Sequence, residues 1–149
     1  MSLEENRAIV RRLIEAINKR NLALLDDLIA QDFFYHAQPH EIQGLDVVKQ
    51  VIEDEVKGFP DLLVTIEDMI AEGDKVWVRL EQTGTHTGEF LGLAPTGKKI
   101  EYASVAIWRI ANGKIVEGWG VYDYLDSYKE LGFIEYTEKT KKLFAEDVS

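Results

Sequence analysis

The spacing of apolar residues changes once along the chain, near residue 62, and no other feature of the sequence limits the fold as much. Before this point, apolar residues recur at the helical spacings i, i+3 and i+4 in three segments, about 3–20, 22–30 and 45–58. After it, four segments have the composition of strands: 62–71, 75–87, 98–111 and 114–124. A block of helices followed by a block of strands predicts an α+β domain.

The predicted strands are long and are joined by turns. Asn112-Gly113 separates the last two and is a strong hairpin signal, because both residues accept the positive φ angles of a type I′ turn. Strands of about a dozen residues exceed the usual length, so a sheet built from them must bend. We therefore expect a strongly bent, mostly antiparallel sheet whose concave side is covered by the N-terminal helices. A further short strand is predicted at the aromatic run Phe33–His36.

The composition argues against several classes of function. The 149 residues fit one domain, and a net charge of −10 opposes binding to nucleic acid or to an anionic membrane surface. The chain has no cysteine, which excludes disulfides, thiolate catalysis and sulfur-ligated metal sites. No apolar run approaches the roughly eighteen residues of a membrane span, and the N-terminus lacks the pattern of a signal peptide. We expect a cytoplasmic protein.

Three motifs occur in order along the strand-rich half: GTHTGEF at 84–90, PTGK at 95–98 and NGKIVEGW at 112–119. Together with Asp123 and Glu130-Leu131-Gly132, they resemble the SnoaL-like polyketide cyclase family of the NTF2-like superfamily. The resemblance implies a cone-shaped α+β barrel. We expect this domain at 1–132, and at 133–149 a helical C-terminal extension that packs on the body or on a partner subunit.

The resemblance also implies a function. It points to acid/base chemistry without a cofactor or metal, such as aldol-type cyclisation, isomerisation or a related proton transfer on a small hydrophobic carbonyl compound. A domain that binds such a compound without turnover is the alternative, and a homodimer through the outer sheet face is expected. The sequence departs from the family pattern at Gly118 and Gly120, which flank Trp119 and should widen or bend the strand.

Asp123 is the first catalytic candidate. If strand 114–124 alternates regularly, Trp119 and Asp123 share one face, and a carboxyl in an apolar pocket gains a raised pKa that suits proton transfer. The resemblance implies that Asp123 removes a proton from an activated carbon and returns one to the carbonyl. The alternative is that Asp123 caps a helix beginning near Tyr124.

Two histidines are the other catalytic candidates. His36 ends the aromatic run, and the resemblance implies a pocket-lining histidine there; His86 lies between glycines that could turn its ring inward. Each has the alternative of an ordinary hydrogen-bonded polar residue. The three histidines of the chain lack metal-ligand spacing.

A third possible function is suggested by a similarity to limonene-type epoxide hydrolases. It requires Arg79 and Glu81, which share a strand face, to point inward beside Asp123; otherwise they belong to the outer face of the sheet. Whichever chemistry holds, aromatic side chains offer flat walls for a planar ligand. The substrate-binding candidates are Trp119, Tyr35, Phe90, Tyr102 and Trp108.

Overall fold

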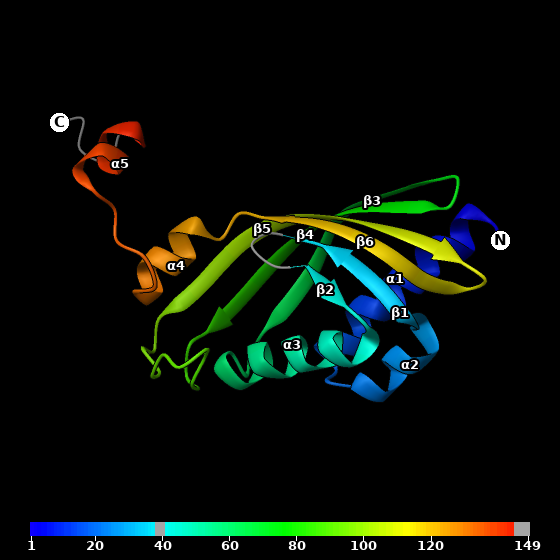
Figure 1. The fold of residues 1–149 in the computed structure, drawn as a ribbon, viewed down its shortest axis with the longest axis horizontal. Coiled ribbons are helices and arrows are strands. Elements are labelled where there is room, and N and C mark those ends of the chain that lie inside the picture. Colours follow the sequence, from blue (N-terminus) through cyan, green and yellow to red (C-terminus); the bar gives the residue numbers. More distant parts are fainter. Residues whose placement is uncertain (38–40, 145–149) are drawn as a thin grey trace.

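The computed structural model describes residues 1–37 and 41–144 and contains one six-stranded sheet with helices on one face (Figure 1). The helical elements are α1 (Leu3–Asn18), the 3-10 turn η1 (Leu22–Leu24), α2 (Leu25–Leu28), α3 (Leu45–Gly58), α4 (Leu125–Leu131) and α5 (Glu138–Leu143). The strands are β1 (Ile29–His36), β2 (Ile42–Gln43), β3 (Leu63–Glu72), β4 (Lys75–Thr85), β5 (Lys99–Ala111) and β6 (Lys114–Tyr122). The predicted α+β class and the four long strands are confirmed.

The strand order is β2-β1-β6-β5-β4-β3, and the sheet is not closed. Among the described strands, only β1 and β6 pair in parallel, and the other neighbours are antiparallel, as expected for a mostly antiparallel sheet. One face of the sheet packs against α1, α2 and α3 and is called the inner face here (Figure 1). The opposite face, called the outer face, is bare of helices in the described part of the chain.

Packing at the N-terminus follows the sequence pattern closely. Ser2 caps α1 by accepting a hydrogen bond from the Glu5 backbone N–H, and the Glu5 carboxylate accepts one from the Ser2 N–H. The α1 positions at helical spacing, Ile9, Val10 and Leu13, are buried against the sheet. The inner face and the helices together enclose the main core.

The pairing of β5 with β6 contains a bulge. Ile110 lies opposite Ile115, whereas Arg109 lies opposite Glu117, so Val116 has no partner. A bulge adds one residue to one strand and reverses which side chains face which side. Beyond Val116 the even-numbered residues of β6 therefore face inward. This local change decides the composition of the site.

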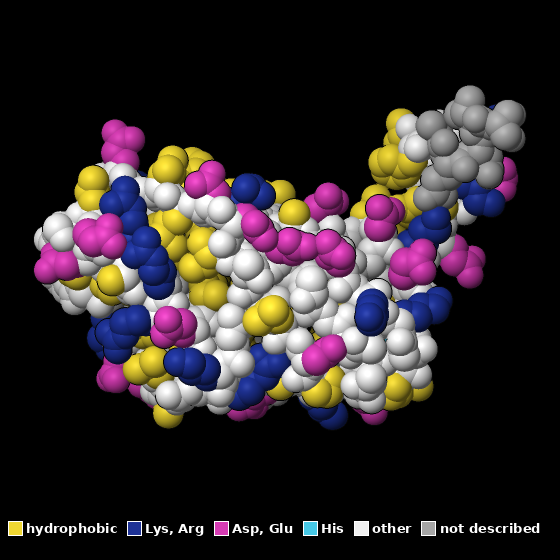
Figure 2. Space-filling view, turned by 180° about the vertical axis from the view of Figure 1, so that it is seen from behind, with side chains coloured by type: hydrophobic (Ala, Val, Ile, Leu, Met, Phe, Trp, Pro, Cys, Tyr) yellow, Lys and Arg dark blue, Asp and Glu magenta, His cyan; other side chains and the backbone are white. Residues whose placement is uncertain are grey.

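The C-terminal segment leaves the body of the molecule after α4. Gly132 ends α4 with φ of 87°, and α5 lies away from the sheet and from α1–α3 (Figure 1). Residues 145–149 of the expected extension lie outside the described residues. In the described ranges, no helix is both long and apolar enough to cross a membrane. Acidic side chains form a row along the surface seen from behind (Figure 2).

Candidate functional site

A cavity of about 130 Å³ lies between α3 and the inner face of the sheet. Its walls are mostly apolar, which favours a hydrophobic guest. Side chains from β1, α3 and the three central strands supply most of the lining, among them Phe33, Tyr35, Val48, Val51, Leu80 and Trp108. A second hollow of about 250 Å³ adjoins it and continues toward α4 and the 86–98 loop. The two hollows share Tyr35, Ile42, Val51, Glu55, Tyr102 and Tyr122.

Glu55 is the carboxylic acid of this cavity. It follows Val48, Val51 and Ile52 at helical spacing, so the face that α3 turns to the sheet ends in a carboxyl group. Among the described residues no hydrogen bond or ion pair to this carboxyl is formed. The Glu55 side chain is half-buried, because one side of it borders the hollow. Protein atoms surround the rest of the side chain. Desolvation, with a smaller contribution from the Asp54 charge, raises the pKa of Glu55 to about 7.

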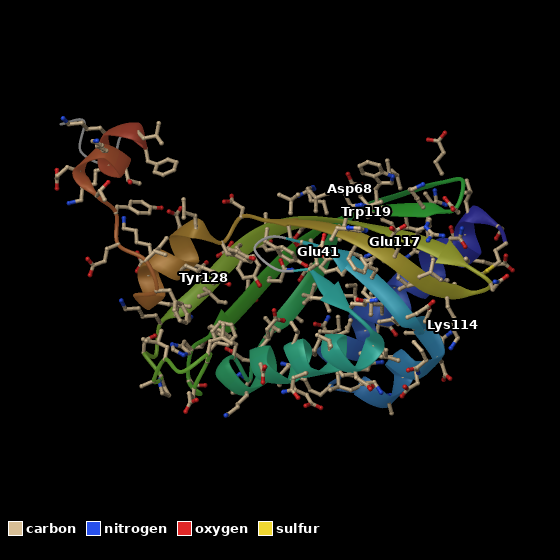
Figure 3. The ribbon with its side chains drawn as sticks, viewed as in Figure 1. Glu41, Asp68, Lys114, Glu117, Trp119 and Tyr128 are labelled. Atoms are coloured by element: carbon tan, nitrogen blue, oxygen red, sulfur yellow. The ribbon has the colours of Figure 1, made fainter. Side chains whose placement is uncertain are left out.

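Tyrosines form much of the wall facing Glu55. The rings of Tyr122, Tyr124 and Tyr128 stack in succession, with centroids 5.5 and 4.5 Å apart. Tyr128 belongs to α4, at one end of the sheet (Figure 3). Tyr35 stacks on Trp108 at 5.3 Å, and its hydroxyl is hydrogen-bonded to the Tyr122 hydroxyl. Burial raises the pKa of Tyr35 to about 12, so its hydroxyl is neutral at physiological pH.

Two glycines of β6 make room for this wall. A Cβ on Gly118 would lie 2.6 Å from the Trp108 ring, and a Cβ on Gly120 would lie 1.8 Å from the Tyr35 hydroxyl oxygen. Neither space admits a side chain larger than hydrogen. Gly118 and Gly120, at which the sequence departs from the family pattern, therefore have a local structural role. They let the Tyr35 and Trp108 rings pack flat on β6.

Two further polar groups border the cavity. Gln82 and Ser104 satisfy each other, since the Gln82 Nε2 donates to the Ser104 Oγ at 3.0 Å and the Oγ donates back to the Gln82 Oε1 at 3.2 Å. The Trp108 Nε1–H is buried and has no hydrogen-bond partner among the described residues. An unpaired buried donor beside a hollow is available to a ligand acceptor.

The structure does not place Trp119 and Asp123 in the cavity. The prediction that they face inward assumed regular alternation, and the bulge at Val116 reverses it, so Trp119 lies on the outer face (Figure 3). Asp123 is exposed, and its backbone N–H donates to the Ala103 carbonyl at 2.9 Å. The alternative prediction also fails, because Tyr124 occupies the N-cap position of α4. Asp123 is thus neither a cavity residue nor a helix cap.

His36 lies on the outer face as well. Its Nε2 is 3.0 Å from a carboxylate oxygen of Glu117, whose other oxygen accepts a hydrogen bond from the Arg109 Nε at 3.0 Å. These two partners lower the pKa of Glu117. The imidazole also stacks on Trp119 at 5.3 Å. The predicted role beside a substrate carbonyl required an inward ring, and the alternation of β1 turns Tyr35 inward and His36 outward.

His86 is fully buried but is packed apart from the cavity. Its Nδ1 accepts a hydrogen bond from the Thr96 backbone N–H at 3.2 Å, and its ring packs on Phe59 at 5.3 Å. The Nε2 has no partner among the described residues. His86 therefore fastens the 86–98 loop to the body. The prediction that the flanking glycines aim the ring into the pocket is wrong.

The structure confirms the cavity position of some of the remaining candidate residues and contradicts that of others. Of the substrate-binding candidates, Tyr35, Phe90, Tyr102 and Trp108 line the two hollows and Trp119 does not. Arg79 and Glu81 emerge on the outer face, alternating with the buried Val78, Leu80 and Gln82, which overturns the epoxide hydrolase alternative. In the described ranges, no group of three or more His, Asp or Glu side chains is placed to hold a metal ion.

Sequence reasoning missed Glu55, although the sequence carries a signal for it. The apolar stripe of the predicted helix 45–58 continues from Val48, Val51 and Ile52 to position 55, where an acidic residue stands. A charged residue on the buried face of an amphipathic helix is costly unless it is paired or functional. The acidic residue that interrupts the apolar stripe is therefore the sequence signal for this site.

Comparison with known proteins agrees with this architecture. The sequence model of the SnoaL-like polyketide cyclase family matches residues 7–131. The chain belongs to the SnoaL-like polyketide cyclase family. It is 28% identical over 141 residues to the aklanonic acid methyl ester cyclase AcmA of Streptomyces galilaeus, covering 87% of this chain and 92% of that protein.

Solved structures of related proteins have the same fold as this chain. AclR of Streptomyces galilaeus, described as a candidate hydroxylase, is 29% identical, covers 97% of this chain with 92% of its own, and superposes with a TM-score of 0.82. IdmH of Streptomyces antibioticus, described as a candidate polyketide cyclase, is 30% identical, with coverages of 85% and 98% and a TM-score of 0.73. The NTF2-like fold is confirmed, and this chain is a SnoaL-like cyclase-related protein.

Proposed function

We propose that this SnoaL-like protein is an enzyme that moves protons on a small hydrophobic carbonyl compound, with Glu55 as its acid/base group. The observation that carries the proposal is the Glu55 carboxyl, which borders an apolar cavity without a polar partner among the described residues. Its pKa of about 7 lets it accept a proton and release it again near neutral pH. Aldol-type cyclisation and isomerisation both begin with such a transfer.

The proposed first step breaks a C–H bond next to the substrate carbonyl. The Glu55 carboxylate takes the proton, the C–H electron pair forms a carbon–carbon double bond, and the carbonyl π pair moves onto oxygen. The product is an enolate beside a neutral Glu55 carboxylic acid. Return of the proton to another carbon gives isomerisation, whereas attack of the enolate carbon on a second carbonyl gives ring closure. Neither route needs an oxidant or a cofactor.

The shape of the cavity supports a flat, mostly apolar substrate. Trp108, Tyr35 and the Tyr122 stack are broad surfaces, and an apolar hollow of about this inner size holds a benzene-sized guest. The adjoining hollow gives room for a second ring and for polar substituents near Asp54 and Tyr128. This supports an aromatic ketone as the simplest test compound.

Filling the cavity should weaken the binding of 2-acetonaphthone, a planar methyl ketone. Val48 faces the cavity, so Val48→Phe places a ring in it and should weaken the Kd by roughly tenfold or more. Val47, the neighbouring residue, is 47% exposed, and Val47→Phe is the matched control with an unchanged Kd. Titration calorimetry measures both. Equal affinities in the two variants would show that the ketone binds elsewhere and would contradict the proposal.

We also propose that the chain forms a homodimer through the outer face. Cross-strand pairing sets Ile70, Trp77, Ile107 and Trp119 side by side across four strands. Ile70 is 61% exposed and Trp77 is 45% exposed. Val121, on the same face, is 75% exposed. An apolar row of this length on an exposed sheet is typical of an interface between copies.

Sedimentation equilibrium should therefore give twice the 17.0 kDa chain mass for the wild type and the single chain mass for Val121→Glu. The buried charge has no partner in the apolar row, which makes association unfavourable. Val47→Glu, on α3 and away from this face, should remain dimeric. A monomeric wild type at micromolar concentration would refute the dimer. That the 133–149 extension packs on the body or on a partner subunit, and that the protein is cytoplasmic, remain predictions.

A further inference from the structure

Two tyrosine hydroxyls are hydrogen-bonded to each other in the wall of the cavity, and one of their two O–H donors is not used in this bond. The hydroxyls of Tyr35 and Tyr122 are hydrogen-bonded to each other, and both residues line the cavity and the adjoining hollow. One hydroxyl must donate to the other. The second hydroxyl then keeps an O–H that this bond does not use, while the pairing strengthens it as a donor.

The surrounding residues hold this pair in place. Tyr35 is 5% exposed, stacks on Trp108 and Phe33, and has Gly120 against its hydroxyl. Tyr122 stacks on Tyr124 at 5.5 Å. Burial raises the pKa of both phenols, which keeps them protonated at neutral pH. A fixed, neutral donor in a largely apolar space is the arrangement that stabilises developing negative charge.

We propose that the Tyr35–Tyr122 pair binds the carbonyl oxygen of the substrate and stabilises the enolate that forms on it. The inference rests on the proposed proton transfer to Glu55. When the carbonyl π pair moves onto oxygen, that oxygen accepts a hydrogen bond from the spare O–H, and no proton leaves the pair. Glu55 approaches from α3 and the pair from β1 and β6, so the proton acceptor and the oxygen site belong to opposite walls of one cavity.

The other polar groups of the cavity are weaker candidates for this site. Gln82 and Ser104 use their hydrogen-bonding groups on each other. The Trp108 Nε1–H is unpaired among the described residues, but it is a single neutral donor without a second group to strengthen it. Trp108→Phe therefore serves as the variant that tests the competing donor.

An equilibrium test uses 2-naphthol, whose oxygen mimics the enolate oxygen, and 2-methylnaphthalene, which lacks it. Wild type should bind 2-naphthol roughly tenfold more tightly than 2-methylnaphthalene. It should also lower the pH at which the bound naphthol ionises, followed by the naphtholate absorption band. Tyr35→Phe and Tyr122→Phe each leave one hydroxyl that still donates, so each should lose only about threefold. The double variant should lose the whole preference and the shift of the band.

Tyr136→Phe is the control, because Tyr136 lies outside the cavity on the C-terminal segment and its loss should change neither readout. Equal affinity for the two compounds in wild type, or loss of the preference in Trp108→Phe alone, would overturn the assignment to the tyrosine pair. Neither result concerns proton transfer, so the role of Glu55 would stand. Failure of both compounds to bind would overturn the cavity as the binding site, and this inference with it.

Discussion

Replacement of Glu55 by Gln is expected to lower the rate of proton exchange at the methyl group of bound 2-acetonaphthone by about 10²- to 10⁴-fold, the usual contribution of a positioned acid/base group. The amide has nearly the same shape as the carboxylic acid but cannot take up the proton. Deuterium incorporation from D₂O, followed by proton NMR at saturating ketone, measures this step without knowledge of the natural substrate. The Kd for the ketone should stay within about twofold.

The pH profile separates a chemical role of Glu55 from a structural one. Wild-type exchange should rise with pH through about 7, where Glu55 becomes ionised, and this limb should vanish in Glu55→Gln. Glu53→Gln, an exposed neighbour on α3, should keep both rate and limb. A full rate in Glu55→Gln would remove this residue from the mechanism. Tight binding without exchange in wild type would instead favour the non-catalytic binding domain.

Stability should depend on Glu55 with the opposite sign to that of a salt-bridged acid. Its folded-state pKa of about 7 is raised above the ordinary glutamate value of 4.5, so the folded state binds the proton more tightly than the unfolded state. The stabilisation is complete below about pH 4.5 and is lost as the pH rises through 7. Glu55→Gln removes this loss. A reduced rate in the variant at neutral pH therefore cannot be ascribed to unfolding.

Replacement of Gly88 by Ala is expected to lower the free energy of unfolding by about 3 kcal/mol. A Cβ on Gly88 would lie 1.8 Å from the carbonyl oxygen of Lys57, and the obstacle is backbone rather than a side chain that can turn away. The same glycine donates its N–H to the Gly58 carbonyl at 3.0 Å. The substitution must push the 86–98 loop away from the end of α3. Urea denaturation measures the loss.

Gly92→Ala is the matched control in the same loop. Gly92 has φ of 82° and open space where a Cβ would stand, so only the backbone preference is lost, at about 1 kcal/mol. Similar losses in the two variants would contradict a steric role for Gly88. Because Phe90, two residues after Gly88, lines the adjoining hollow, Gly88→Ala should also weaken ketone binding more than Gly92→Ala does.

The GTHTGEF motif thus has a structural role in this member of the family. Gly88 meets the end of α3, His86 is fastened by Thr96, and Phe90 packs on Phe59 at 5.2 Å. Together they hold the loop that borders the adjoining hollow. The motif was a correct guide to the fold. It was a poor guide to the catalytic residues, because its histidine, His86, is hydrogen-bonded within the loop and does not reach the cavity.

The expectation that Asp123 faces the cavity was wrong for a different reason. Asp123 directly follows β6, so the side to which it points depends on whether the alternation of β6 is regular, and the additional residue at Val116 reverses that alternation. Gly118 and Gly120 indicate a bend in this strand, but they do not identify Val116 as the additional residue. A strand periodicity read from sequence is therefore reliable for the existence of β6 and unreliable for the side to which any one residue points.

The sequence alone determined the elements of this protein. Apolar periodicity located α1, α3 and the four long strands, and colinear motifs identified the family, because these depend on local spacing and composition. The tertiary structure decided which side chains meet. Glu55 on α3, Tyr35 on β1 and Tyr122 on β6 are far apart in the chain, and the bulge and the two glycines of β6 bring their groups to one cavity. Side-chain direction and long-range packing arise only when the sheet bends around α3.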